Sequence, residues 1–362
     1  MSAPPEPTSV TVPAELRSLR ERVDDRLAEV LDGEHARWSD FDPLLAEPIA
    51  RLRSFSVNGG KRLRPAFCHL GHVAVGGDPT DPVVLDAGTA LELLHVFALV
   101  HDDVMDGSTL RRGAPTIHQH FGELHAASEW VGESRRFGEG VAVLVGDLAL
   151  VLADALLTGA PPAAWDVYNE LRVELVMGQV LDVASAALPT SDPATSQKIS
   201  LFKSAKYTVE RPLHLGAALA GRLDESAAAF TGYGLPVGEA FQLRDDVLGA
   251  FGDESTLGKP VGDDFRENKP TRLVLHAIAE ANEHQLTPAL EVLSRLGDPE
   301  LDAAGVVAIQ EVLEATGARR AVEDRIERLL GDAVDSLDAA DLESTARRQL
   351  VDLAVYCAHR DR

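Results

Sequence analysis

The sequence predicts an all-α protein, and two observations carry that prediction. Apolar residues recur at three- and four-residue intervals through most of the chain, first at Leu16, Leu19, Val23 and Leu27, which places them on one stripe of a helix. No segment shows the apolar–polar alternation of a half-buried strand. We therefore expect a single helical domain over residues 14–362, after a disordered tail at 1–13 rich in Pro, Ser and Thr.

Turn-forming residues divide this pattern into successive helices. Breaks are expected at 76–79, 159–162, 188–189 and 297–299, where Gly, Asp and Pro cluster or Pro follows Leu. The sequence shows no short internal repeat and no long linker after the tail. The predicted helices lie near residues 14–37, 43–55, 61–75, 82–105, 115–128, 138–158, 163–187, 194–222, 225–250, 270–283, 299–316, 318–335 and 340–359.

The charge balance narrows the possible ligands. The chain carries 58 Asp and Glu against 34 Lys and Arg, a formal net charge of -24. Nucleic acid and anionic membrane surfaces would be repelled by such a chain, so neither is expected as a partner. An anionic substrate must therefore meet a local basic cluster or a bound metal ion.

Membrane insertion and disulfide bonding are also not expected. The most apolar stretch, 141–157, is interrupted by Asp147 and Asp154, which a lipid-facing helix accommodates only at high cost. The two cysteines, Cys68 and Cys357, lie far apart without metal-type spacing. This usage suits a reducing compartment, and we expect a cytoplasmic protein.

The first candidate site is an acidic cluster at the end of the helix predicted at 82–105. Asp102, Asp103 and Asp106 form a DDxxD arrangement, and the carboxylates of 102 and 106 share one face because they are one turn apart. Like charges crowded there are unfavourable unless a cation intervenes. Oxygen ligands of this kind suit Mg²⁺, although a lone DDxxD in an acidic protein is more often a solvated helix end.

A second cluster, Gln242, Asp245 and Asp246, strengthens the functional interpretation. It lies at the end of another apolar helix. Two acidic clusters on two helix ends can hold metal ions on opposite sides of one diphosphate, neutralising its charge and improving it as a leaving group.

Basic residues accompany both clusters. Lys61 and Arg64 lie in the segment GGKRLRP that opens a helix, and Arg111 and Arg112 follow the first acidic cluster. Helix N-termini and guanidinium groups both suit phosphate oxygens. The remaining candidates for an anion pocket are Lys203, Ser204, Lys206, Lys259 and Lys269. Each of these lysines taken alone is explained equally well as a solvated surface residue. The whole set of acidic and basic clusters, however, predicts a site for diphosphates and metal.

Three segments in order, GGKRLRP, HDDVMDGSTLRRG and FQLRDDVLGAFGD, resemble the signature regions of trans-isoprenyl diphosphate synthases, and the resemblance spans roughly residues 20–360. It implies an all-α isoprenoid-synthase fold, a helical bundle around a deep central cavity, usually in a homodimer. The implied reaction is Mg²⁺-dependent head-to-tail condensation of isopentenyl diphosphate with an allylic diphosphate (dimethylallyl, geranyl or farnesyl). Three ions are implied with substrate bound, with Mn²⁺ as an alternative.

The resemblance assigns roles to the matching residues. The implied metal ligands are Asp102, Asp106 and Asp245, supported in catalysis by Asp103, Asp246 and Lys203. Isopentenyl diphosphate would be held by Lys61, Arg64, His95 and Arg112. The allylic diphosphate would contact Arg111, Lys203, Ser204, Gln242, Lys259 and Lys269. His95 alone would be interpreted as a core or surface histidine, but it lies seven residues before Asp102.

The chain departs from the family pattern at two positions. Gly249 stands where many members carry a third aspartate, and Asp253 further along is an alternative acid, although a loop acid is its simpler interpretation. Ser204 stands where the family commonly has Thr, which keeps the hydroxyl.

Two residues before the first acidic cluster are candidates for setting product length. Phe97 and Ala98 lie five and four residues before Asp102, about one turn away at about 1.5 Å per residue. By periodicity Phe97 is a core residue, while the resemblance gives an aromatic there to short-chain synthases. We expect geranylgeranyl diphosphate as the main product, with farnesyl diphosphate or a longer polyprenyl diphosphate as alternatives.

Other classes of protein explain the sequence less well. A class I terpene cyclase shares the DDxxD cluster but usually mixes Asn, Ser and Glu in its opposite motif. A di-metal carboxylate oxidase needs paired Glu-x-x-His motifs, which the sequence lacks. A non-catalytic regulatory subunit should have lost key acids or arginines, whereas here only position 249 departs clearly.

Overall fold

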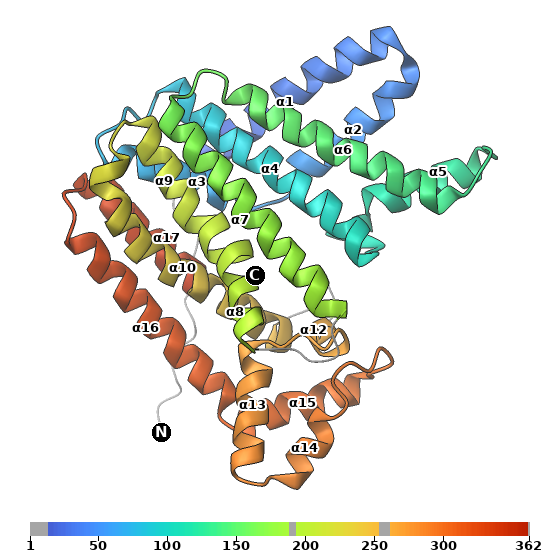
Figure 1. Cartoon of the computed structure of the whole chain (residues 1–362), viewed down its shortest axis with the longest axis vertical. Helices are drawn as coiled ribbons and strands as arrows, with labels where there is room; N and C mark the ends of the chain where they lie inside the picture. The colour runs from blue at the N-terminus through green and yellow to red at the C-terminus, as the bar shows by residue number, and fades with distance from the viewer. Residues whose placement is uncertain (1–13, 188–192, 253–260, 361–362) are drawn as a thin grey trace.

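A computed structural model describes residues 14–187, 193–252 and 261–360 and confirms the all-α class. Helices run from α1 (Ala14–Phe41) to α17 (Ser344–His359), as Figure 1 shows. The predicted tail at 1–13 lies outside the described residues, and the single domain stays a prediction.

Most predicted helices appear within a few residues of their expected bounds. The helices of the N-terminal half are the 3₁₀ turn η1 (Pro43–Leu45), α2 (Ala46–Val57), α3 (Leu63–Ala74), α4 (Pro82–Asp106), α5 (Ile117–Ala127), α6 (Ser134–Leu156) and α7 (Pro162–Ala187). Those after it include α10 (Leu223–Phe251), α13 (Arg272–Glu283), α15 (Ala303–Ala315) and α16 (Ala318–Asp338). Two short helices were not predicted, α12 (Asp263–Arg266) and α14 (Thr287–Leu293).

The prediction that the chain has no strand is wrong at one small hairpin. Strands β1 (Leu110–Arg111) and β2 (Ala114–Pro115) pair antiparallel. The two residues between them, Arg112 and Gly113, both have positive φ, at 52° and 74°, which is the backbone that a tight two-residue hairpin requires. Strands of two residues are too short to show alternation, so no apolar–polar pattern marks them in the sequence.

The helix predicted at 194–222 is three consecutive segments rather than one. They are α8 (Pro193–Ser200), the π-helical segment η2 (Leu201–Glu210) and α9 (Arg211–Leu219). A π-helix inserts extra backbone per turn, is rare, and is frequent at functional sites. Because the apolar pattern continues through it, the change of helix type was invisible in the sequence.

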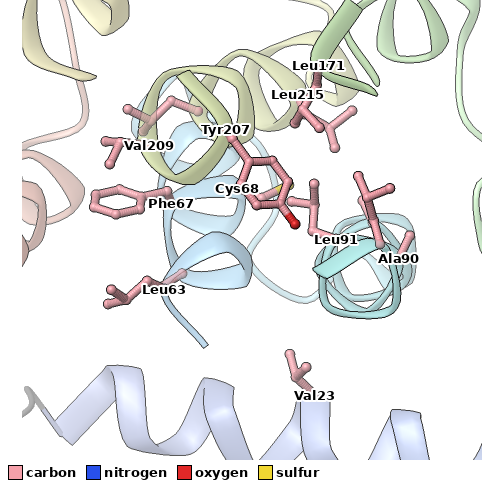
Figure 2. Packing of buried hydrophobic residues seen from close by; sticks show 14 of the residues in the cluster. Val23, Leu63, Phe67, Cys68, Ala90, Leu91, Leu171, Tyr207, Val209 and Leu215 are labelled. Atoms are coloured by element: carbon pink, nitrogen blue, oxygen red, sulfur yellow. The ribbon is translucent and has the colours of Figure 1, made fainter. Parts of the chain in front are cut away.

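Two clusters of buried side chains hold the helices together. The first includes Phe67 of α3, Leu91 of α4 and Tyr207 of η2, which are labelled in Figure 2. The second surrounds the C-terminal part of α10 and includes Val247 and Ile326, where α10 packs along α16 (Figure 1).

Helices α3 and α9 approach closely because glycine lies at their contact. A Cβ on Gly71 would lie 2.4 Å from the carbonyl oxygen of Leu213, and one on Gly216 would lie 2.0 Å from that of Cys68. Both distances are shorter than any side chain allows, so glycine is required there. The contact joins α3, which follows the predicted basic segment, to α9, which follows η2.

Helix α4 is the one described helix long and apolar enough to cross a membrane by length and composition. In its most apolar window 61% of the residues are buried inside the protein. The core helix of a globular protein passes the same test, and α4 lies between α3 and α6.

Candidate active site

The first acidic cluster lies at the C-terminal end of α4. Gly107 adopts the left-handed conformation, with φ 65°, and ends the helix one residue after Asp106. The carboxylates of Asp102 and Asp106 therefore stand at the negative end of the helix dipole, which adds to their need for a cation. Burial raises the pKa of Asp106, and the nearby charge of Asp102 raises it further.

Asp103 has a different environment from its two neighbours. Its side chain is 1% exposed, and Arg111 of β1 donates to its Oδ1 over 2.7 Å. Burial raises the pKa of Asp103, while the Arg111 guanidinium opposes that rise. Asp103 thus holds the hairpin against α4, which agrees with a supporting role and commits Arg111 to an ion pair.

Lys203 of η2 meets the first cluster together with two residues of α7. Its Nζ lies 3.3 Å from Asp102 Oδ1 and 2.5 Å from Asp182 Oδ2. Gln179 Nε2 donates to the same Asp102 oxygen over 2.8 Å. Gln179 and Asp182 were missed in the sequence, although their spacing of three on a helix predicts a shared face.

The second cluster contacts η2 through Ser204, the residue after Lys203. Ser204 Oγ donates to Gln242 Oε1 over 2.6 Å, and Gln242 Nε2 donates to Asp246 Oδ1 over 3.0 Å. Burial raises the pKa of Asp246 to about 7, with Asp264 and Asp245 adding to the rise. Asp245 pairs with Arg360, which follows α17 and was also missed in the sequence.

Segment η2 therefore joins the two acidic clusters. Lys203 reaches Asp102 on α4, and the adjacent Ser204 reaches Gln242 on α10. The charge of Lys269 acts on the pKa of Asp106, so the basic residue after α12 also lies near the first cluster. The two clusters, 139 residues apart between Asp106 and Asp245 in sequence, share one region of the fold.

Basic residues gather beside this region. Arg64 stacks on Tyr207 with its Cζ 4.2 Å from the ring centre and donates to Thr208 Oγ1 over 3.1 Å. Arg112 donates to the carbonyl of Asn58 over 2.8 Å, next to the glycines of the basic segment. Burial lowers the pKa of His95, and the charges of Arg64, Arg112 and Arg111 lower it further. The structure thus brings together three of the four groups assigned to isopentenyl diphosphate.

Two buried polar atoms in this basic group fit an anionic ligand. Nε of Arg64 and Nδ1 of His95 have no hydrogen-bond partner among the residues that the structure describes. Buried polar atoms are nearly always paired, so such atoms indicate a ligand. The fourth residue, Lys61, acts with Arg360 on the pKa of the buried Cys357 thiol, which places it on the side of Asp245.

The acidic donor set fits Mg²⁺ held jointly by protein and phosphate. Within the described ranges, no three acid, His or Cys side chains converge closely enough to bind a metal by themselves. Mg²⁺ commonly takes one or two carboxylates together with waters and phosphate oxygens. Asp102 and Asp106 on α4 and Asp245 on α10 would supply such oxygens.

The family profile of polyprenyl synthetase matches residues 44–304. The chain belongs to the polyprenyl synthetase family. It is 31% identical over 353 residues to a short chain isoprenyl diphosphate synthase of Methanothermobacter thermautotrophicus, covering 96% of this chain and 98% of that protein. It is 29% identical to a (2E,6E)-farnesyl diphosphate synthase of Mycobacterium tuberculosis, covering 95% of this chain and 89% of that one.

A solved structure of similar fold is the geranylgeranyl pyrophosphate synthase of Corynebacterium glutamicum, complexed with isoprenyl diphosphate and magnesium. It matches with a TM-score of 0.88 and 37% identity, covering 95% of this chain and 99% of that one. The enzyme class predicted from the sequence is confirmed: this polyprenyl synthetase is a trans-prenyltransferase.

Some residues predicted for the synthase site have other partners. Lys206 pairs with Glu174 over 2.6 Å and with Glu210 over 3.4 Å, which leaves it little capacity for an anion. Lys269 pairs with Asp264 and Glu267. Lys259 and Asp253 lie outside the described residues.

Asp264 is the acid that the structure brings to Gly249. A Cβ on Gly249 would lie 2.8 Å from Asp264 Oδ2, and the backbone N–H of Gly262 donates to the Gly249 carbonyl over 3.1 Å. The space that a third aspartate would need is therefore occupied by a carboxylate from α12. Because Asp264 lies fifteen residues further along the chain, helical spacing did not reveal it.

Phe97 and Ala98 are partly buried and pack against the first core cluster. The Phe97 ring lies against that of His101, one turn closer to the metal ligands, with ring centres 4.6 Å apart. The role of both residues in product length stays a prediction.

Proposed function

We propose that this polyprenyl synthetase makes geranylgeranyl diphosphate by Mg²⁺-dependent, head-to-tail addition of isopentenyl diphosphate to dimethylallyl, geranyl and farnesyl diphosphate. The observation that carries the proposal is the bridge through η2, where Lys203 and Ser204 connect the two acidic clusters. The similarity to the C. glutamicum geranylgeranyl synthase favours this product. The similarity to the M. tuberculosis farnesyl synthase keeps the C15 product as the alternative.

The side chains around η2 would prepare the allylic diphosphate to leave. Asp182 and Asp102 hold the Lys203 ammonium from two sides, so that its remaining hydrogen can point to a phosphate oxygen. Bound Mg²⁺ would neutralise charge on the departing diphosphate. Arg64, His95 and Arg112 would hold isopentenyl diphosphate, whose double bond attacks the allylic cation. The double bond is itself the nucleophile and the released diphosphate would accept the proton, so neither a protein nucleophile nor a protein base is required.

The deciding experiment is extension of labelled isopentenyl diphosphate with Mg²⁺ and separate C5, C10 and C15 starters. We expect C20 as the longest major product, and loss of at least about 100-fold in rate in Asp102→Ala, because a positioned charge at the reacting group is lost. Asp324→Ala is the matched control, since Asp324 is a 60% exposed acid on α16. No extension with any starter would overturn the proposal.

The ions are tested separately from the product. We propose three Mg²⁺ per site with substrate bound, and Mn²⁺ as an alternative ion. Titration calorimetry with Mg²⁺ and a non-reactive bisphosphonate should give that stoichiometry in the wild type and a lower one in Asp102→Ala. Equal stoichiometry in both proteins would remove Asp102 from the metal ligands.

We also propose a homodimer built on exposed apolar stripes of α6 and α7. On α6, Leu144 and Val151 are 68% and 62% exposed, and on α7, Val173, Met177 and Val180 are 55%, 49% and 56% exposed. Apolar stripes of this length on a chain of net charge -24 are typical of an interface. Leu144→Glu and Met177→Glu should yield monomers by light scattering. Val307→Glu on α15, where the side chain is 50% exposed, should leave the dimer intact.

A further inference from the structure

Three groups enclose the His101 ring between α4 and α6: the Phe97 ring, the Val143 carbonyl and Gly146. We call this enclosure the seat. Its ring packs on Phe97 with centres 4.6 Å apart. Its Nε2 lies 3.0 Å from the carbonyl oxygen of Val143. Because a carbonyl only accepts, Nε2 carries the proton in this bond.

Gly146 forms the third side of the seat. A Cβ on this residue would lie 2.3 Å from His101 Nε2 and 2.4 Å from Cδ2. Any side chain at 146 would therefore displace the histidine ring. The glycine and the carbonyl belong to the same turn of α6, so that turn fixes both the position and the orientation of the ring.

The fixed position of the His101 ring limits where the Phe97 ring can lie. The two residues are four apart on α4 and share one face. With His101 held by α6, the Phe97 ring cannot move toward the metal ligands, because the histidine ring already fills that turn. The space beside Phe97 is thus set by α6 as much as by α4.

We propose that His101 is the positioning residue for Phe97 and that the pair, seated on Gly146, sets the product length of the enzyme. This inference rests on the proposed function, in which Phe97 closes the path of the growing chain. Removal of the imidazole lets Phe97 turn toward α6 into the vacated space, which frees the space that Phe97 now occupies for a further isoprene unit. The ligand affected is the apolar tail of the allylic diphosphate, not its charged head.

The test compares product lengths in His101→Ala, Gly146→Ala, the double variant and Phe97→Ala, each normalised to total label incorporated. The ratio of the next longer product to the main product should rise by about tenfold in each single variant, as for a changed hydrophobic pocket. Gly146→Ala acts by displacing the ring, so the double variant should lengthen no further than either single one. Asp147→Ala, which removes the acid 3.8 Å from His101 Nε2 and keeps the ring, should leave product length unchanged.

The variants distinguish the role of His101 from the role of Phe97 and from the synthase activity itself. If Phe97→Ala lengthens the product while His101→Ala or Gly146→Ala does not, His101 does not position Phe97 and the inference is overturned. If Phe97→Ala also leaves the product unchanged, the inference falls with its premise, while the synthase activity stands. A wild-type protein without prenyl transfer overturns the function itself. Because a merely structural loss would reduce all products alike, product ratio is the decisive readout.

Discussion

At the scale of single residues, Gly249 lacks the carboxylate that many family members carry there, and Asp264 places a carboxylate beside it instead. The Asp264 carboxylate lies where a Cβ of residue 249 would meet it at 2.8 Å. An aspartate at 249 would add a further carboxylate beside Asp264 and Asp246, in a region where burial already raises the pKa of Asp246 to about 7. The carboxylate that faces position 249 therefore comes from α12 rather than from α10.

This arrangement predicts that Gly249→Asp destabilises the protein by about 1–3 kcal/mol, through overpacking and like charge. The measurement is the free energy of unfolding in urea. Adding Asp264→Ala to Gly249→Asp should recover most of the loss. Gly33→Asp on α1, where nothing lies within 4 Å of a Cβ, controls for the loss of glycine itself. Equal stabilities of the 249 and 33 variants would contradict the prediction.

Sequence reasoning at this scale succeeded where chemistry and helical spacing coincide. Asp102 and Asp106 are one turn apart, and Gln242 and Asp246 are likewise, so each pair could be placed on one face before the structure was known. Asp264 and Arg360 could not be assigned in this way, because they reach the site from other elements. No local pattern records a contact between residues so distant in sequence.

At the scale of elements, a buried arginine fixes the entry to α3. Arg62 has φ 52° and is 4% exposed. It donates to Asp24 of α1 over 2.7 Å, to Glu92 of α4 over 2.6 Å and to the carbonyl of Ser56 in α2 over 2.7 Å. Four helices thus meet on one guanidinium, beside the basic residues Lys61 and Arg64.

Removing that guanidinium leaves Glu92, with a side chain 4% exposed, as an uncompensated buried charge. We expect Arg62→Ala to lower the free energy of unfolding by about 3–5 kcal/mol. Arg53→Ala breaks a surface pair with Asp32, whose side chains are 39% and 56% exposed, and should cost far less because exposed ion pairs contribute little to stability. Urea unfolding of the two variants gives the comparison. A similar loss in both would show that Arg62 does not stabilise the four-helix junction.

Element prediction worked where one face of a helix is apolar and failed where the backbone changes without a change of pattern. Helices α13 and α16 have such a stripe and were found close to their predicted bounds. The π-helical backbone of η2 carries the same kind of side chains as an α-helix, so the way it joins the two acidic clusters through Lys203 and Ser204 was not predictable. The two-residue strands of the hairpin depend on positive φ at Arg112, a residue that rarely adopts it.

At the scale of the whole molecule, the helices enclose basic residues inside a strongly acidic protein. The net charge of -24 repels anions at long range, yet His95 is surrounded by arginines. Attraction of a diphosphate must therefore act at short range, through those arginines and bound metal. This agrees with the sequence argument that an anionic substrate needs a local site.

The same enclosure makes stability depend on pH through histidines that stay neutral when folded. Burial lowers the pKa of His69 on α3 to about 4, and the charges of Arg22 and His72 lower it further. The unfolded chain should titrate this histidine near about 6.5. As the pH falls from about 6.5 to about 4, the unfolded state takes up a proton that the folded state refuses, so stability decreases over that window and is constant below it.

We therefore expect His69→Asn to reduce the acid dependence of stability. One proton corresponds to a slope of about 1.4 kcal/mol per pH unit in the free energy of unfolding. The variant should therefore lose a slope of about this size between pH 6 and 5. The measurement is the free energy of unfolding in urea at both pH values and at one protein concentration, because a dimer would make stability depend on concentration. Parallel pH curves for variant and wild type would show that His69 has the same pKa in the folded and the unfolded protein. The folded protein would then have to accommodate a charged imidazole at this position of α3.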